Sequence, residues 1–175
     1  MRRRMILAMT IVLIVSVATC ARLAGGRPPI HDITTDTSDP PSFVDVLPLR
    51  AGAKNSAVYG GSAVAALQHA AYPDIAPVNL SLAPAAAFAK ALAAANAMEW
   101  SIVAVDSAAG RIEATATTRV FRFKDDVVIR IRPDSGGSRV DIRSVSRIGG
   151  GDLGKNASRI REFITRLRES APHAP

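Results

Sequence analysis

The sequence predicts an α+β fold, a two-layer sandwich in which two helices cover one face of a mainly antiparallel sheet. Four consecutive segments between residues 100 and 143 alternate apolar and polar side chains, with short turn sequences between them, and two other segments place apolar residues at helical spacing. Both helices need one sheet face to bury their stripes, so the opposite face is expected to be partly exposed to solvent. The domain is assigned to residues 77–170, followed by a disordered tail, 171–175.

The domain should begin with a strand and a helix. Residues 78–82 alternate and suit a strand, and the alanine-rich run from Pro84 to Met98 is a strong helix former with proline in its first turn. Phe88, Leu92 and Ala95 lie at i, i+4 and i+7 and give this helix one apolar face.

The four strands that follow should form an antiparallel meander. They are expected at residues 100–106, 111–123, 127–132 and 139–143. The alternation of the second strand slips near Val120 and Phe121, where a β-bulge would explain the change of phase. Five large side chains are expected to anchor the core: Phe88, Trp100, Phe121, Phe123 and Phe163.

A final helix should start near Asn156, whose side chain can cap it. Glu162 and Arg166 form an i,i+4 pair on its flank. Its apolar stripe follows the i, i+3, i+4, i+7 pattern through Ile160, Phe163, Ile164 and Leu167.

The amino terminus, residues 1–24, reads as a signal or membrane-anchor segment. Three arginines precede an uncharged run from Met5 to Ala21, a length on the boundary between a signal peptide and a spanning helix. Three fates stay open: an uncleaved anchor, a lipoprotein whose lipidated residue is Cys20, and ordinary cleavage near Ala21 or Ala24. The excess of arginine before the run favours a cytoplasmic amino terminus and a translocated domain. The expected location is a bacterial cytoplasmic membrane with the domain facing outward.

Residues 25–76 are expected to form an extended linker with a short helix. Proline pairs at 28–29 and 40–41 indicate loop structure, and residues 60–71 can form the helix. Phe43, Val44, Val46 and Leu47 are apolar enough to dock on the domain.

The net charge of +7 is unevenly distributed. Residues 31–106 carry 3 basic and 7 acidic side chains, whereas residues 111–168 carry 14 basic and 7 acidic ones. Such an asymmetry can attract an anionic partner, although internal pairing is the commoner explanation. Cys20 is the single cysteine and the histidines lack ligand spacing, so neither a metal nor a cofactor is predicted. Nucleic acid is not an expected partner, because aromatic and basic residues do not interleave.

A glycine-rich run at residues 149–156 gives the sharpest local motif. It matches the phosphate-loop spacing up to Lys155, but Asn156 replaces the magnesium-binding hydroxyl residue and the sheet looks antiparallel, which argues against nucleotide hydrolysis. Free amides at a helix start, with Lys155 nearby, could still hold an anion; otherwise the run is a flexible connection.

A second cluster lies on one face of adjacent strands. Arginines there can bind carboxylates or phosphates bidentately, or can form a cross-strand charge ladder with Asp141 and Glu113. The predicted binding residues from both clusters are Arg130, Arg132, Asp141, Arg143, Arg147, Asp152, Gly154, Lys155, Asn156 and Arg159. No residue is assigned a catalytic role.

The run from Phe121 to Phe163, with Tyr-Pro-Asp-Ile at 72–75 upstream, resembles an uncharacterised bacterial family, domain of unknown function 1499. The resemblance implies a membrane-associated protein and no established activity. The leading hypothesis is a non-enzymatic envelope module for an anionic lipid, polymer or protein. The alternatives are an enzyme that uses the arginine–aspartate face and a scaffolding subunit with an exposed apolar patch.

Overall fold

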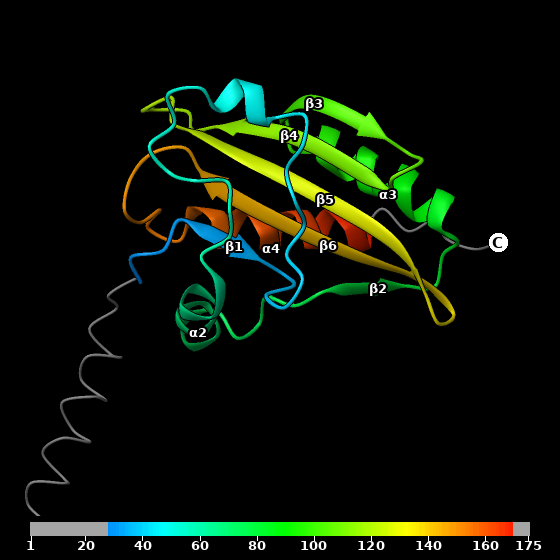
Figure 1. Ribbon diagram of the computed structural model, residues 1–175. Coiled ribbons are helices and arrows are strands. Elements are labelled where there is room, and N and C mark those ends of the chain that lie inside the picture. Colours follow the sequence, from blue (N-terminus) through cyan, green and yellow to red (C-terminus); the bar gives the residue numbers. More distant parts are fainter. Residues whose placement is uncertain (1–27, 170–175) are drawn as a thin grey trace, which may run out of the picture.

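The structure is a computed structural model that describes residues 28–169. Its sheet has six strands, and three α-helices and one 3-10 helix complete the fold (Figure 1). The elements are β1 (Asp32–Thr34), η1 (Leu47–Arg50), α2 (Gly61–Ala71), β2 (Val78–Leu80), α3 (Pro84–Ala97), β3 (Ser101–Asp106), β4 (Arg111–Thr117), β5 (Lys124–Asp134), β6 (Gly137–Ser146) and α4 (Lys155–Glu169). The prediction of an α+β fold with an antiparallel sheet is confirmed.

The sheet is antiparallel throughout, in the order β1-β6-β5-β4-β3, and β2 also pairs with β6. The predicted meander from β3 to β6 is therefore present. β1 and β2 share one edge of β6: Ile33 lies opposite Ser144, and Val78 lies opposite Val140.

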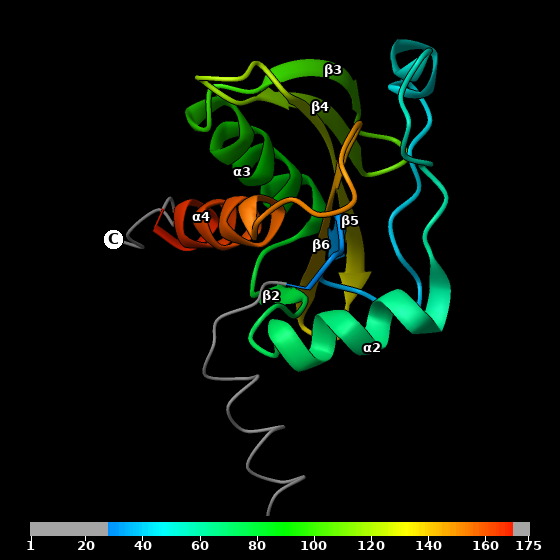
Figure 2. The same ribbon diagram turned by 90° about the vertical axis from the view of Figure 1, so that its left-hand side faces the viewer.

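The two predicted helices pack on one face. Figure 2 shows α3 and α4 together on the same side of the sheet. Phe163 and Leu167 of α4 are fully buried, as are Ala91 and Ala94 of α3. Trp100 stacks on Phe163 with ring centroids 5.8 Å apart, so the small alanines let α3 approach while two aromatic rings fill the space beside α4.

The opposite face is more covered than expected, and it stays partly exposed at Arg132 and Arg139, whose side chains are 39% and 31% exposed. Residues 35–59, here called the strap, run across it and carry η1 (Figures 1 and 2). Phe43 and Val46 of the strap are buried against Val128 and Val145 of the sheet, as predicted. Val44 and Leu47 are exposed, so the expectation that they dock is wrong.

The folded unit accordingly starts before the predicted boundary at residue 77, because β1 and the strap belong to it. Gln68 of α2 explains how this short strand is held. Its side-chain amide donates to the carbonyl of Thr34 (2.7 Å) and accepts the Thr34 amide (3.0 Å), so it satisfies backbone groups at the open edge of β1. Residues 28–59 are therefore a packed segment and not a free linker.

The second meander strand is shorter than predicted. β4 ends at Thr117, and residues 118–123 form a loop in which Arg122 takes a positive φ of 56°. Phe121 and Phe123 are exposed, so the prediction of five aromatic core residues is wrong for these two. The register irregularity lies instead between Ile102 and Ala104 of β3.

No helix within residues 28–169 is long and apolar enough to cross a membrane. The predicted membrane segment, the lipidation candidate Cys20 and the predicted tail 171–175 lie outside the described residues.

Candidate functional site

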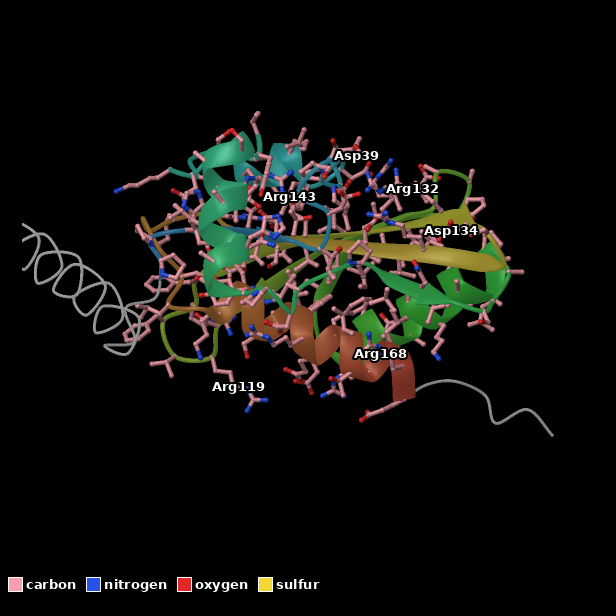
Figure 3. All side chains as sticks on the ribbon, turned by 90° about the horizontal axis from the view of Figure 1, so that it is seen from below. Asp39, Arg119, Arg132, Asp134, Arg143 and Arg168 are labelled. Carbon is pink, nitrogen blue, oxygen red and sulfur yellow. The ribbon has the colours of Figure 1, made fainter. Side chains whose placement is uncertain are left out.

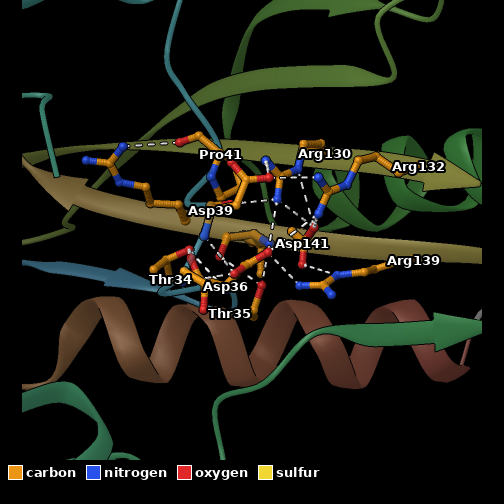
Figure 4. Close-up of polar contacts among 12 residues, drawn as sticks. Thr34, Thr35, Asp36, Asp39, Pro41, Arg130, Arg132, Arg139 and Asp141 are labelled. Carbon is orange, nitrogen blue, oxygen red and sulfur yellow. Dashed lines mark hydrogen bonds and ion pairs between the residues drawn. The ribbon is translucent and has the colours of Figure 1, made fainter. Parts of the chain in front are cut away.

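The arginines predicted on the sheet face form an ionic network beneath the strap. Figure 4 shows the guanidinium groups of Arg130, Arg132 and Arg139 converging on three carboxylates. One belongs to Asp141 in the sheet, and the other two belong to Asp36 and Asp39 in the strap. Asp141 is fully buried and receives all three guanidinium groups, at 2.9, 3.2 and 3.0 Å. In a strand, residues 130, 132, 139 and 141 share one face because side chains alternate, and the β5–β6 register places Arg130 opposite Asp141.

The strap supplies the remaining counter-charges of this network. Asp36 contacts all three arginines, most closely Arg139 at 2.6 Å, and Asp39 contacts Arg130 and Arg132 at 3.1 and 2.8 Å. The hydrogen bond from Arg132, together with the charge of Arg130, lowers the pKa of Asp39. Three arginines therefore meet three aspartates, and the network carries no net charge with which to attract an anion.

Arg143 is enclosed separately. It makes a bidentate pair with Asp32 of β1 (2.9 and 2.7 Å) and donates to the carbonyls of Pro41 and Ala57. Its guanidinium also lies 5.1 Å from the ring centroid of Phe43 and 5.5 Å from that of Tyr59. Only 2% of the surface of Arg143 is exposed, so its contacts hold the strap and β1 against β6 in the interior.

Two further buried carboxylates complete the strap face. Asp126 accepts from Thr115, Arg50 and Arg147 (2.8, 2.5 and 2.8 Å). Glu113 accepts the backbone amides of strap residues Val44 and Val46, each at 2.8 Å. Both carboxylates thus bind the strap to the sheet and have their lone pairs occupied.

The glycine-rich loop between β6 and α4 is also internally satisfied. Its backbone amides at Gly154 and Asn156 donate to the carboxylate of Asp152 (2.8 and 2.5 Å), so they are not free to hold an anion. Asp152, not Asn156, caps α4.

Asn156 instead connects three elements. Its fully buried amide donates to the carbonyl of His31 (2.9 Å) and to Ser146 Oγ (3.0 Å), and its oxygen accepts from Ser144 and Arg159. Arg159 also pairs with Asp125 at 2.6 Å. This cluster joins α4 to β1, β5 and β6 and plays a structural role.

A cleft of about 520 Å³ opens on the helix side, between α4, the carboxyl end of α3 and the end of β4. Its charged lining residues are Arg119, Lys155, Arg159, Arg166, Glu99 and Glu162. Glu162 pairs with Arg166 at 2.9 Å, which confirms the predicted i,i+4 pair, and Glu99 lies 3.9 Å from Arg119. Lys155 is exposed, and among the described residues its ammonium has no ion-pair partner.

A sequence profile described as "protein of unknown function (DUF1499)" matches residues 32–167 of the chain. The chain belongs to the DUF1499 family. The matched region runs from the first residue of β1 into the last turn of α4, so it coincides with the unit that the structure shows as one sheet and its cover. The resemblance predicted from the sequence is confirmed. A comparison with curated proteins finds no match to the chain.

The structure of this DUF1499 domain separates the predicted site residues into two groups. The strap-face group, whose side chains are internally paired, comprises Arg130, Arg132, Asp141, Arg143 and Arg147. The loop group comprises Asp152, Gly154, Lys155, Asn156 and Arg159, of which only Lys155 presents an uncommitted charge.

Sequence reasoning missed the cations that surround Lys155. Lys54, Arg119, Arg122 and Lys124 are exposed. The first three lie in loops and Lys124 begins β5, at the same end of the sheet. The Lys54 amide donates to the Arg147 carbonyl (2.9 Å), and the Arg147 amide donates to the Lys124 carbonyl (3.0 Å). We call the end formed by Lys54, Arg119, Arg122, Lys124 and Lys155 the basic end. Figure 3 shows Arg119 projecting outward on the helix side, whereas Asp39 and Arg132 lie together on the opposite side.

One signal in the sequence pointed to this division. The chain has 22 lysines and arginines, and every cation in the strap-face pairs is arginine, whereas three of the five cations at the basic end are lysine. Arginine suits bidentate, buried pairing and lysine stays hydrated, so residue type distinguished the two sets.

Proposed function

We propose that this DUF1499 protein is a non-enzymatic binding module held at a bacterial cytoplasmic membrane by residues 5–21, with its domain on the outer side. We propose further that it binds an anionic lipid, envelope polymer or protein through the basic end. The observation that carries the proposal is the uneven pairing of charge. The strap-face arginines are matched by carboxylates, while Lys54, Arg122, Lys124 and Lys155 have no ion-pair partner within residues 28–169.

Unpaired cations at a cleft edge suit an anionic partner better than paired ones. A paired guanidinium must first lose its carboxylate, whereas an exposed ammonium can approach an anion without that cost. Lys155 lines the 520 Å³ cleft, beside the hydroxyl of Ser158 and the guanidinium of Arg119, which lies 3.9 Å from Glu99. The binding residues are therefore proposed to be the five cations of the basic end, in place of Arg130, Arg132 and Arg143.

The test is affinity capture of the full-length chain from gently solubilised membranes, with mass spectrometry of proteins, of lipids and of the chain's own amino terminus. We compare wild type with Lys155→Glu and with Arg168→Glu, a matched charge reversal at the other end of α4. The expected result is an anionic species that co-purifies with wild type and Arg168→Glu and is depleted at least several-fold from Lys155→Glu. An identical set of co-purifying species from all three chains would refute the assignment to the basic end.

The mass of the amino terminus distinguishes the three fates of residues 1–24. An intact terminus supports the anchor, a lipidated Cys20 supports the lipoprotein, and a terminus near residue 22 or 25 supports cleavage. Either of the last two results would remove the spanning segment from the proposal and leave the basic end to be judged by the capture alone.

A further inference from the structure

The basic end also carries three of the four most exposed large apolar side chains of the described residues. Val120, Phe121 and Leu153 expose 80%, 74% and 71% of their surface. Phe123 and Ile148 are exposed to a smaller extent, and Val58 of the strap lines a pocket together with Lys54. At the far end of the sheet, the β5–β6 turn instead presents Asp134 and Ser135. Moderately exposed apolar residues elsewhere, such as Leu67 and Val105, are scattered singly and need no explanation, but a cluster of strongly exposed ones at one end marks a contact surface.

These side chains sit on loops with defined conformations. The Thr118 amide donates to the Phe123 carbonyl (2.9 Å), the Phe123 amide returns to Thr118 Oγ1 (2.9 Å), and the rings of Phe121 and Phe123 stack at 5.5 Å. Leu153 adopts a left-handed φ of 54°, a backbone conformation unfavourable for a residue with a β-carbon. The fold thus holds the exposed side chain of Leu153 in solvent at a backbone cost.

The same loops are tied to the point where the chain enters the domain. The Asp152 amide donates to the Ile30 carbonyl (3.3 Å), and a β-carbon on Gly151 would lie 3.3 Å from the α-carbon of Pro29. Six residues, 22–27, separate the apolar run from Pro28. Even a fully extended connection of this length spans only about 25 Å.

We propose that the basic end is a membrane-contact surface: Val120, Phe121 and Leu153 insert into the interface of a bilayer that contains anionic lipid, and the surrounding lysines and arginines contact its headgroups. Exposed apolar side chains surrounded by basic residues suit binding at a membrane interface. The apolar side chains contribute by burial in the bilayer, and the basic ones contribute by attraction to anionic lipid. The inference rests on the proposed anchoring of the chain, because the anchor selects this end as the one facing the bilayer. Contact through this surface fixes the orientation of the domain relative to the bilayer. The strap face then lies to the side of the domain, and the β5–β6 turn with Ser135 points away from the bilayer.

The test places a tryptophan at each end of the full-length chain reconstituted in vesicles of phosphatidylcholine and phosphatidylglycerol. Trp100→Phe removes the native indole, and Phe121→Trp, Leu153→Trp or Ser135→Trp then provides one probe per chain. Brominated lipids quench indoles that reach the acyl region. We expect quenching at 121 and 153 to be at least three-fold stronger than at 135. Adding Arg122→Glu and Lys124→Glu should lower the quenching at 153 by half or more.

The outcomes separate the two proposals. If the chains float with the vesicles but 121 and 153 are quenched no more than 135, this inference is wrong and the anchoring stands. If the chains do not float with vesicles at all, the anchoring fails and this inference falls with it. A blue-shifted signal at 121 that depends on protein density and not on lipid would assign the surface to a second copy and overturn the proposal. Thermal unfolding of the Trp100→Phe chain checks that the background is folded.

Discussion

The two faces of the sheet are built from the same strands but bind the segments that cover them through different interactions. On the helix face, Ile112, Ile129 and Ile142 are buried under α3 and α4 and contribute through apolar burial. Their chain neighbours Glu113, Arg130 and Arg143 point to the strap face and are held by ion pairs and hydrogen bonds. Alternate residues of one strand therefore belong to two different cores: an apolar core under α3 and α4, and an ionic core, made of ion pairs and hydrogen bonds, under the strap.

The difference shows what each cover requires. A helix satisfies its own backbone hydrogen bonds and needs only an apolar stripe, whereas the strap has little regular structure and presents backbone groups to the sheet. Glu113 accepts two strap amides, and Arg143 donates to two strap carbonyls. Charged side chains on this face are the partners that allow an irregular segment to be buried.

The strongest way to break the comparison is to remove a central carboxylate of the strap face. Asp126→Ala leaves Arg50 and Arg147 without their shared partner, and removing one member of a buried ion pair costs about 3–5 kcal/mol. Denaturant unfolding of the full-length chain in detergent should show this loss. Asp45→Ala, which removes an exposed partner of Arg111, should cost less than about 1 kcal/mol. Equal effects of the two changes would mean that the strap face behaves as an ordinary wet surface.

Much of the helix face was predictable from the sequence, and the strap face was not. The stripe of Ile160, Phe163 and Leu167 has a period that only a helix places on one face, and its burial follows. The alternation of the strands also identified which residues share a face. It did not distinguish a polar residue in water from one in a buried ion pair, because both occupy the non-apolar positions of the pattern.

The internal pairing of the predicted site residues was hidden in the sequence for the same reason. Asp36, which pairs with Arg130, and Asp32, which pairs with Arg143, lie 94 and 111 residues earlier in the chain, in a segment whose prolines indicated a linker. The opposed charges of the two halves were visible, but pairing between distant segments is a property of the tertiary fold. Phe121 and Phe123 misled in the opposite way, since an aromatic residue in an alternating run predicts a core position and these two lie in a loop.

A double-mutant cycle sharpens the comparison at the Asp32–Arg143 pair. Asp32→Leu alone leaves the buried Arg143 guanidinium, which is 2% exposed, without its carboxylate partner. Arg143→Met alone leaves the buried Asp32 carboxylate without its guanidinium partner. The double variant should be less destabilised than the sum of the two by about 1–3 kcal/mol, because neither charge is left alone. Full recovery is not expected, since the carbonyls of Pro41 and Ala57 lose their donor. A coupling energy near zero in denaturant unfolding would show that the pair is solvated.

Tyr59 offers a smaller test, because its hydroxyl is buried without a hydrogen-bond partner among the described residues. Burial, followed by the charge of Asp32, raises the pKa of Tyr59 to about 12. The neutral phenol is thus favoured in the fold, so this contribution is present below pH 10 and is lost as the pH rises through about 12. Tyr59→Phe keeps the ring over Arg143 and should change stability by less than about 1 kcal/mol at neutral pH. It should also flatten the alkaline loss of stability, and an unchanged alkaline profile would contradict the assignment.

The smallest effect is expected at Asp39, the most exposed carboxylate of the network. Hydrogen bonding from Arg132 lowers its pKa, so its contribution is present above the ordinary aspartate pKa of about 3.9 and is lost as the pH falls through the lower folded-state value. Its side chain is 64% exposed, and solvent screening limits the contribution at neutral pH to about 1 kcal/mol or less. Asp39→Asn should therefore shift the acid side of the stability profile slightly and leave the alkaline side unchanged. High salt should weaken the wild-type advantage over Asp39→Asn but leave the cost of Asp126→Ala intact, because screening reaches the rim of the ionic core and not its buried centre. If salt reduced both differences equally, the strap would not exclude solvent from the sheet, and the distinction between the two cores would fail.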